Sequence, residues 1–157
     1  MAGLKDQNDM INDFYVTADQ SKFDFNKIYQ FISKSSYWAE GIPMTILKKS
    51  ISNSLSFALF YKEQQIGIAR VVTDYATFGY LADVFIDPEF RGKGLSKLLM
   101  NFIMSYPQLQ GLRRWMLATR DAHFLYEKYG FNPLEKPERI MELVDKDIYT
   151  RSHHQLD

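Results

Sequence analysis

The sequence predicts a mixed α/β fold, in which a mainly antiparallel central sheet is flanked by helices. The first observation is a run of three apolar segments, residues 55–61, 66–74 and 78–86, joined by short polar turns. Strands joined in this way pair antiparallel. The second observation is a helical apolar stripe over residues 92–106 followed by a strand pattern over 114–119. A strand, a helix and a strand in this order place the two strands parallel.

The residues before these strands predict one short strand and two helices. Residues 14–17 form the strand, and Asp24 can cap a helix in which apolar residues recur at helical spacing over 25–32. Residues 35–42 are predicted as a loop because they interrupt this spacing. Pro43 suits the first position of the second helix, since its fixed φ angle matches the helix and its missing N–H is not needed there.

Three strands follow the second helix. Apolar and other side chains alternate with period two over residues 55–61, which is typical of a strand. A polar turn is predicted over 62–65 and the next strand over 66–74. The strand over 78–86 ends at Asp87-Pro88, because proline cannot donate a ladder hydrogen bond.

The C-terminal half predicts two helices and two strands. The helix over 92–106 ends before Pro107, and a strand covers 114–119. A short helix over 121–129 is closed by Gly130 in a left-handed conformation. A last strand is predicted over 140–144.

Composition limits the classes of protein that the chain can represent. Its 157 residues suit a single domain over residues 1–157, with loose ends at about 1–11 and 151–157. The 19 basic and 19 acidic residues balance, which argues against nucleic-acid binding. The absence of cysteine removes disulfides, thiolate metal sites and thiol nucleophiles, and no metal site is expected. No apolar run approaches the roughly 18 residues of a membrane span, and the polar start lacks a signal-peptide core. We therefore expect a cytoplasmic protein with no membrane partner.

The turn Arg91-Gly92-Lys93-Gly94-Leu95-Ser96 precedes the predicted helix and carries the strongest chemical signal. A helix start presents unpaired N–H groups, and two glycines let an anion approach the backbone closely. Arg91 and Lys93 add positive charge, so the turn favours a phosphate or pyrophosphate. The spacings of a P-loop and of a dinucleotide fingerprint are both absent. Taken alone, the turn is more readily an ordinary strand-to-helix connection with surface charges.

Two motifs together resemble the GNAT superfamily of N-acetyltransferases. The pattern Arg-x-x-Gly-x-Gly/Ala after Asp-Pro-Glu-Phe is matched by Arg91, Gly94 and Ser96, although Ser96 replaces the usual smaller residue. The second motif, Ala-x-x-Leu-Tyr-x-x-x-Gly-Phe, matches residues 122–131, and Thr119 stands where many members carry Asn. The resemblance covers roughly residues 55–145.

The resemblance implies a binding site for acetyl-CoA as cosubstrate. The strand end over 84–86 is expected to splay from its parallel neighbour and to pair with the pantetheine arm, while the turn binds the pyrophosphate. The implied cofactor-binding residues are Val84, Phe85, Ile86, Arg91, Gly92, Lys93, Gly94, Leu95 and Ser96. Tyr126 is implied as the proton donor to the CoA sulfur, the alternative being a packed helix tyrosine like Tyr129.

The acceptor side is less defined by the sequence. Asp83 is a candidate base, but an ion pair with Arg70 across the two strands would make it a poor one, and deprotonation through water is then expected. Tyr37 and Trp38 lie in the loop that roofs the acceptor site in the family, where they either contact substrate or anchor the loop. With Asp83, they are the candidate substrate-binding residues.

The resulting expectation is an N-acetyltransferase that moves an acetyl group from acetyl-CoA to a primary amine by direct attack. A small-molecule acceptor is favoured, because no charged run suggests a docking site for a protein tail. The alternatives are a catalytically silent acyl-CoA-binding module and acetylation of a protein amine. Homodimers are common in the family, and the sequence shows no specific interface signal.

Overall fold

A computed structural model describes residues 13–151 of the chain. Its centre is a five-stranded sheet in the order β1-β2-β3-β4-β5, where β1 is Phe14–Thr17, β2 Leu55–Tyr61, β3 Gln64–Thr73, β4 Phe78–Ile86 and β5 Arg114–Leu117. The first four strands pair antiparallel, and β4 pairs with β5 in parallel. The predicted mixed α/β fold, with one parallel pair in a mainly antiparallel sheet, is therefore confirmed.

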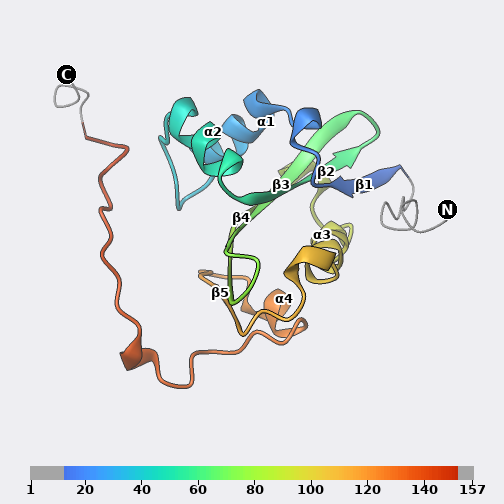
Figure 1. Ribbon diagram of the computed structural model, residues 1–157. Helices are drawn as coiled ribbons and strands as arrows, with labels where there is room; N and C mark the ends of the chain where they lie inside the picture. Colours follow the sequence, from blue (N-terminus) through green and yellow to red (C-terminus); the bar gives the residue numbers. More distant parts are fainter. Residues whose placement is uncertain (1–12, 152–157) are drawn as a thin grey trace.

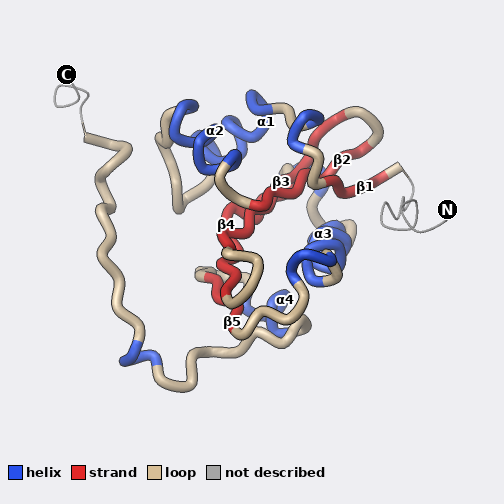
Figure 2. The backbone as a smooth tube through the Cα atoms, viewed as in Figure 1, coloured by secondary structure: helices blue, strands red, loops and turns tan. Residues whose placement is uncertain are grey.

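The helices lie on both faces of the sheet (Figures 1 and 2). On one face are α1, Phe25–Tyr29, which continues as a π-helix over Gln30–Lys34, and α2, Met44–Ser52. On the other are α3, Leu95–Met104, and α4, His123–Glu127. The Asp24 carboxylate accepts a hydrogen bond from the N–H of Lys27, as expected of a helix cap. Short 3₁₀ turns cover Gln20–Lys22, Pro88–Phe90, Pro107–Leu109 and Pro137–Arg139.

Alternating side chains of the sheet form two separate cores. Phe57 and Leu59 are fully buried in the core shared with α3 and α4, which we call the α3–α4 core. Their neighbours Ala58 and Phe60 are buried in the core shared with α1 and α2, the α1–α2 core. The period-two alternation of β2 thus reflects burial on both faces, which holds the sheet between two helical layers.

Several predicted boundaries differ from the structure. The helix predicted from residue 92 begins at Leu95, because Gly92 and Gly94 take φ angles of 78° and 76°, outside the helical region. The turn after β2 is tighter than expected, since β3 begins at Gln64. Pro43 is the N-cap of α2 instead of its first residue. The strand predicted over 114–119 ends at Leu117 and the helix predicted over 121–129 covers His123–Glu127.

The strand predicted over 140–144 is wrong. These residues form no ladder with any described strand, and their side chains are exposed. A strand needs a neighbour for its backbone hydrogen bonds, and this segment runs away from the sheet (Figure 1). Of the loose ends predicted, 1–11 and 152–157 lie outside the described residues, and Arg151 is exposed and described.

Among the helices described over 13–151, none has both the length and the apolar character required to cross a bilayer.

Candidate active site

The candidate site lies where β4 and β5 part. Their parallel pairing runs from Phe78 opposite Arg114 to Leu81 opposite Leu117 and stops there, while β4 continues to Ile86. Beyond that point a groove of about 760 Å³ opens between the two strands, the loop after α1 and the start of α4. The splay predicted for residues 84–86 is present and already begins after Leu81, so the end of β4 has no β5 partner within the described chain.

A bulge in β4 shapes the wall of this groove. Arg70 lies opposite Ala82, whereas Ile68 lies opposite Phe85, so β4 carries one extra residue between these pairs. Asp83 sits at this bulge with a φ angle of 55°, an uncommon conformation for a residue with a side chain. The bulge explains why Asp83 joins Ala82 and Val84 in lining the groove, although simple strand parity would direct it to the opposite face.

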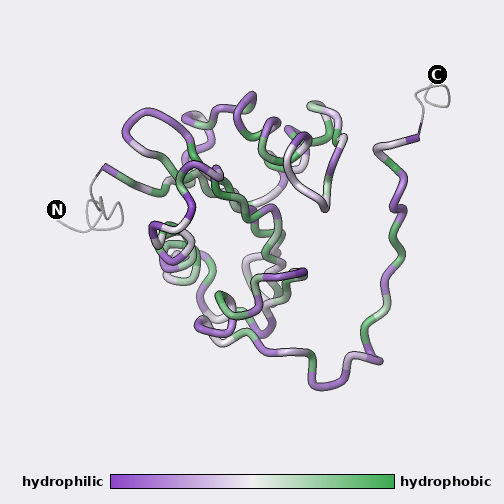
Figure 3. Tube along the Cα trace, turned by 180° about the vertical axis from the view of Figure 1, so that it is seen from behind, coloured by the Kyte–Doolittle hydropathy of each residue, from purple (hydrophilic) through white to green (hydrophobic). Residues whose placement is uncertain are grey.

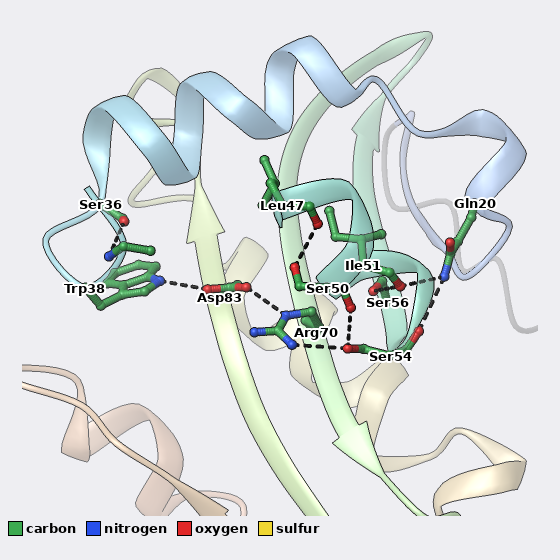
Figure 4. A network of polar contacts seen from close by, with 11 residues as sticks. Gln20, Ser36, Trp38, Leu47, Ser50, Ile51, Ser54, Ser56, Arg70 and Asp83 are labelled. Atoms are coloured by element: carbon green, nitrogen blue, oxygen red, sulfur yellow. Dashed lines mark hydrogen bonds and ion pairs between the residues drawn. The ribbon is translucent and has the colours of Figure 1, made fainter. Parts of the chain in front are cut away.

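The Asp83 carboxylate is held on both oxygens (Figure 4). Nε of Arg70 donates to Oδ2 over 2.8 Å, and Nε1 of Trp38 donates to Oδ1 over 2.8 Å. Only 19% of the Arg70 side chain and 11% of the Asp83 side chain are exposed. A further bond of 3.1 Å joins Nη1 of Arg70 to the Ser54 hydroxyl. The predicted ion pair is therefore present, and both carboxylate oxygens already accept a hydrogen bond.

Tyr126 lies on α4 with only 7% of its surface exposed, and it lines the groove. Burial raises the pKa of its phenol to about 12, and Tyr37 and Asp121 act in the same direction. The hydroxyl is therefore protonated at neutral pH and is a hydrogen-bond donor there. Just before α4, the Thr119 hydroxyl accepts a 3.0 Å hydrogen bond from the N–H of Ala122, which fixes the entry to the helix.

The turn before α3 has the properties of an anion site. Gly94 is the N-cap of α3, no side chain caps the helix, and no atom lies within 4 Å of where a Cβ of Gly92 or Gly94 would sit. The first N–H groups of a helix have no intrahelical partners, so they are available to an anion at this end of α3. Because the Leu95 side chain is buried, only its backbone is available to a ligand. Ser96 follows, half-buried, on the first turn.

The two basic side chains of the turn are oriented by neighbouring residues. Nε of Arg91 donates a 2.9 Å hydrogen bond to the carbonyl of Ile86, and the guanidinium lies 5.1 Å from the centre of the Phe85 ring. The ammonium of Lys93 lies 5.6 Å from the Phe90 ring. These contacts connect the turn to the end of β4, so the two expected cofactor-binding segments are adjacent.

The loop after α1 contributes two aromatic residues to the groove. Tyr37 and Trp38 are 49% and 41% exposed and line the groove. Trp38 is tied to Asp83, and the Tyr37 hydroxyl accepts a 3.2 Å hydrogen bond from the N–H of Arg120. The Arg120 guanidinium lies 3.9 Å from the centre of the Tyr37 ring. Both side chains therefore anchor the loop and border the groove at once.

Sequence reasoning did not single out several residues that line the groove, among them Arg120 and Tyr149. Tyr149 packs against the α1–α2 core, and its carbonyl oxygen lies 3.0 Å from where a Cβ of Gly41 would be. Gly41 has a φ angle of 81°, so glycine is favoured there on both grounds. An isolated tyrosine in a charged C-terminal segment was the available signal for Tyr149. Nothing in the local sequence pointed to Arg120.

Comparison with known proteins assigns the family. Residues 25–131 match the Acetyltransferase (GNAT) family model. A crystal structure from Xanthomonas campestris pv. campestris, described as belonging to the GNAT family, is 45% identical with a TM-score of 0.85, covering 87% of this chain and 96% of that one. The chain therefore belongs to the GNAT family of acetyltransferases, and it is an N-acetyltransferase by class.

Curated relatives agree with this assignment. A Gibberella zeae protein named as a candidate acetyltransferase is 31% identical over 146 residues. The match covers 79% of this chain and 81% of that protein. The [ribosomal protein bS18]-alanine N-acetyltransferase of Haemophilus influenzae is 30% identical over 119 residues, 71% of this chain and 77% of that protein. The GNAT family uses acetyl-CoA as acetyl donor.

Proposed function

We propose that this chain transfers the acetyl group of acetyl-CoA to a primary amine of a small molecule by direct attack. The observation that carries the proposal is the groove at the parting of β4 and β5, which has Tyr126 on one wall. The uncapped start of α3 follows the turn that Arg91 ties to the end of the same strand, β4. The groove's volume of about 760 Å³ is in the range of small-molecule sites.

Each segment of the site has one role in this proposal. The N–H groups at the start of α3, with Arg91 and Lys93, hold the pyrophosphate, using the backbone of Gly92 to Ser96. The unpaired edge of residues 84–86 binds the pantetheine arm and directs main-chain N–H groups toward the thioester carbonyl. These groups stabilise the negative charge that develops on the carbonyl oxygen as the amine adds.

The reaction forms a C–N bond and breaks the C–S bond of the thioester. The amine nitrogen attacks the carbonyl carbon in its neutral form, and its extra proton passes to water, since Asp83 is engaged by Arg70 and Trp38. The electron pair of the broken bond goes to the CoA sulfur. Tyr126, whose phenol is protonated at neutral pH, donates a hydrogen bond to that sulfur as it becomes a thiolate.

The acceptor end of the groove is lined by aromatic side chains and by the ion pair of Arg70 and Asp83. Tyr37, Trp38 and Tyr149 border it, with Asp83 and Arg70 between them. In this proposal Tyr37 and Trp38 contact the acceptor, and Asp83 binds it through its lone pairs that Arg70 and Trp38 leave open. A protein amine is the second candidate, because the name of the Haemophilus influenzae relative specifies an alanine of a ribosomal protein. We further propose a cytoplasmic homodimer.

Release of CoA thiol tests the proposal directly. Because the chain contains no cysteine, a thiol reagent reports CoA without background from the enzyme. Turnover with acetyl-CoA on a panel of small amines supports the proposal, and turnover only with peptides starting in alanine supports the second candidate. Saturable acetyl-CoA binding without turnover on either panel would instead indicate a silent binding module.

A further inference from the structure

Arg70 places a charge in the apolar centre of the sheet. It is the only charged residue of β3, and the central strands are largely hydrophobic when the chain is coloured by hydropathy (Figure 3). Only 19% of its side chain is exposed, and a buried charge is costly unless it is paired. Asp83 pairs with it, but a lysine would also supply a positive charge, so the ion pair alone does not require an arginine.

The guanidinium of Arg70 has a donor that the described residues do not use. Nε binds Asp83 and Nη1 binds the Ser54 hydroxyl, whereas Nη2 has no hydrogen-bond partner among the described residues. In Figure 4 this third nitrogen carries no dashed line and points to the side on which Trp38 lies. It is not enclosed, because the Ser33 hydroxyl is the one buried side-chain nitrogen or oxygen without a partner in this part of the chain. Since Arg70 lines the groove, a ligand there can reach Nη2.

The open donor of Arg70 lies beside the open acceptor positions of Asp83. Nη2 is bonded to the same carbon as Nε, which donates to Oδ2 of Asp83 over 2.8 Å. Each carboxylate oxygen accepts one hydrogen bond, from Arg70 or from Trp38, and keeps a second lone pair. The wall of the groove therefore presents N–H groups of a cation next to oxygen atoms of an anion. A molecule with an amine and a carboxylate on the same carbon matches this arrangement.

The rest of the groove lining indicates what else the acceptor carries. Apolar and aromatic side chains surround the ion pair, among them Tyr37, Trp38, Ile46, Tyr80 and Tyr149. Among the described residues, the other charged side chains of the lining are Arg120 and Asp121, which are 66% and 70% exposed. The groove thus has no second buried carboxylate for a second ammonium group, which makes a polyamine a poor match. An apolar or aromatic side chain fits the lining.

We propose that the acceptor is an α-amino acid with an apolar or aromatic side chain, and that Arg70 is the residue that selects it. Nη2 donates to the carboxylate of the amino acid, and Asp83 accepts a hydrogen bond from its amine. The amine forms the C–N bond, CoA leaves as the thiol, and the carboxylate is unchanged. The inference rests on the proposed acetyl transfer and adds the chemical class of the acceptor.

The carboxylate also separates a free amino acid from a protein amine. In a peptide the first residue has an amide in place of its α-carboxylate, and a neutral amide oxygen is a weaker partner for a guanidinium than a carboxylate. Nη2 of Arg70 would then lack an anionic partner. The proposal therefore favours a free amino acid over the second candidate, a protein terminus like the alanine in the name of the Haemophilus influenzae relative.

Matched acceptors test the proposal on the unchanged protein. Phenylalanine and leucine are each compared with the corresponding amide and the corresponding decarboxylated amine by release of CoA thiol. We expect kcat/KM for each amino acid to exceed that of both analogues by at least about 10-fold, the effect of one charge-assisted hydrogen bond. The amide is the weaker base and has more neutral amine, so basicity alone would favour the amide. An equal or higher kcat/KM for the analogues would overturn the proposal.

Calorimetry separates a failure of this inference from a failure of the proposed reaction. The same compounds are titrated into the protein saturated with CoA, so that binding is measured without turnover. Preferential binding of the amino acids, with no turnover of any amine by acetyl-CoA, would support the acceptor class and refute the proposed reaction. Turnover of amines without preference for a carboxylate would support the reaction and overturn the acceptor class. Absence of binding by both amino acids would also overturn it.

Arg70→Lys tests the role of Nη2. Lysine keeps a positive charge beside Asp83 but has no second nitrogen for a carboxylate. We expect the ratio of kcat/KM between phenylalanine and its amide to fall by about 10-fold, and this ratio does not depend on the amount of folded protein. Arg120→Lys is the matched control on an exposed arginine of the same groove, and it should keep the ratio. An unchanged ratio in Arg70→Lys would overturn the assignment, and a loss confined to Arg120→Lys would place the carboxylate at Arg120 instead.

Discussion

Arg70 donates a 2.8 Å hydrogen bond from Nε to Oδ2 of Asp83, although the residue directly opposite Arg70 in the strand register is Ala82. The β4 bulge displaces Asp83 by one position and turns it toward Arg70 and Trp38. The pair thus joins the central strands to the loop after α1. We expect the pair to hold the bulge and the loop in place, in addition to the contact proposed between Asp83 and the acceptor.

Replacing Asp83 by Asn should lower the free energy of unfolding by about 1–3 kcal/mol, because the mostly buried Arg70 guanidinium loses its counter-ion. Urea denaturation measures the change. Asp121→Asn is the control. Asp121 lies 3.9 Å from Arg120, and the two side chains are 70% and 66% exposed, so this contact should contribute less than about 1 kcal/mol. Equal effects for the two variants would contradict a structural role for Asp83.

The same substitution separates positioning from proton transfer. If Asp83 only positions the groove, Asp83→Asn raises KM for the amine and leaves the shape of the kcat–pH profile unchanged. A general base would contribute about 10²–10⁴-fold to the rate and define an acid limb in that profile. Loss of the acid limb in Asp83→Asn would assign the base role to Asp83. Trp38→Phe removes one of the two hydrogen bonds to the carboxylate, so we expect it to raise KM as well.

The sheet and the glycine turn before α3 could be predicted because their signals are local. The alternation over residues 55–61 and the positive charge and glycines of 91–94 need no distant partner to be interpreted. The bulge at Asp83 could not be predicted, since one extra residue in β4 is visible only against its pairing with β3. The apolar pattern of 140–144 predicted a strand, but a strand also needs a neighbour, and the described part of its own chain supplies none.

Removing the Tyr126 hydroxyl should slow the chemical step without weakening cofactor binding. In Tyr126→Phe the CoA sulfur loses its hydrogen-bond donor, and we expect kcat to fall by about 10²–10³-fold, as for other single donors at developing charges. Tyr129→Phe is the control, because its hydroxyl bonds to Asn101 over 2.9 Å on α3, outside the groove. Thiol-release kinetics and acetyl-CoA calorimetry measure both quantities. Unchanged kcat in Tyr126→Phe would remove Tyr126 from the mechanism.

The buried phenol should also make stability depend on alkaline pH. The folded-state pKa of Tyr126 is raised to about 12 from 10.0, so above pH 10 the unfolded chain releases a proton that the folded chain retains. Its contribution is therefore fully present below pH 10 and is lost as pH rises toward 12. The loss amounts to about 2–3 kcal/mol for a shift of this size. Denaturation of the unchanged protein and Tyr126→Phe at pH 9 and near pH 11 should show a steeper decline in the unchanged protein. Parallel declines would mean that burial does not perturb this phenol.

Gly94→Asp tests the anion site, and Gly111→Asp is the control at a glycine with a similar φ angle. Gly94 and Gly111 have φ angles of 76° and 79°, and neither has an atom within 4 Å of a Cβ placed on it. An aspartate at either position therefore costs about 1–2 kcal/mol of backbone strain, and both variants should lose similar stability. Only the Gly94→Asp substitution places a side chain and a negative charge at the start of α3, where we propose that the pyrophosphate binds. We expect calorimetry to show acetyl-CoA binding weakened by at least about 10-fold in Gly94→Asp, since like charge and lost N–H contacts together exceed about 1.4 kcal/mol. Equal acetyl-CoA affinities in Gly94→Asp and Gly111→Asp would place the cofactor elsewhere, because the charge at position 94 would then have no effect on binding.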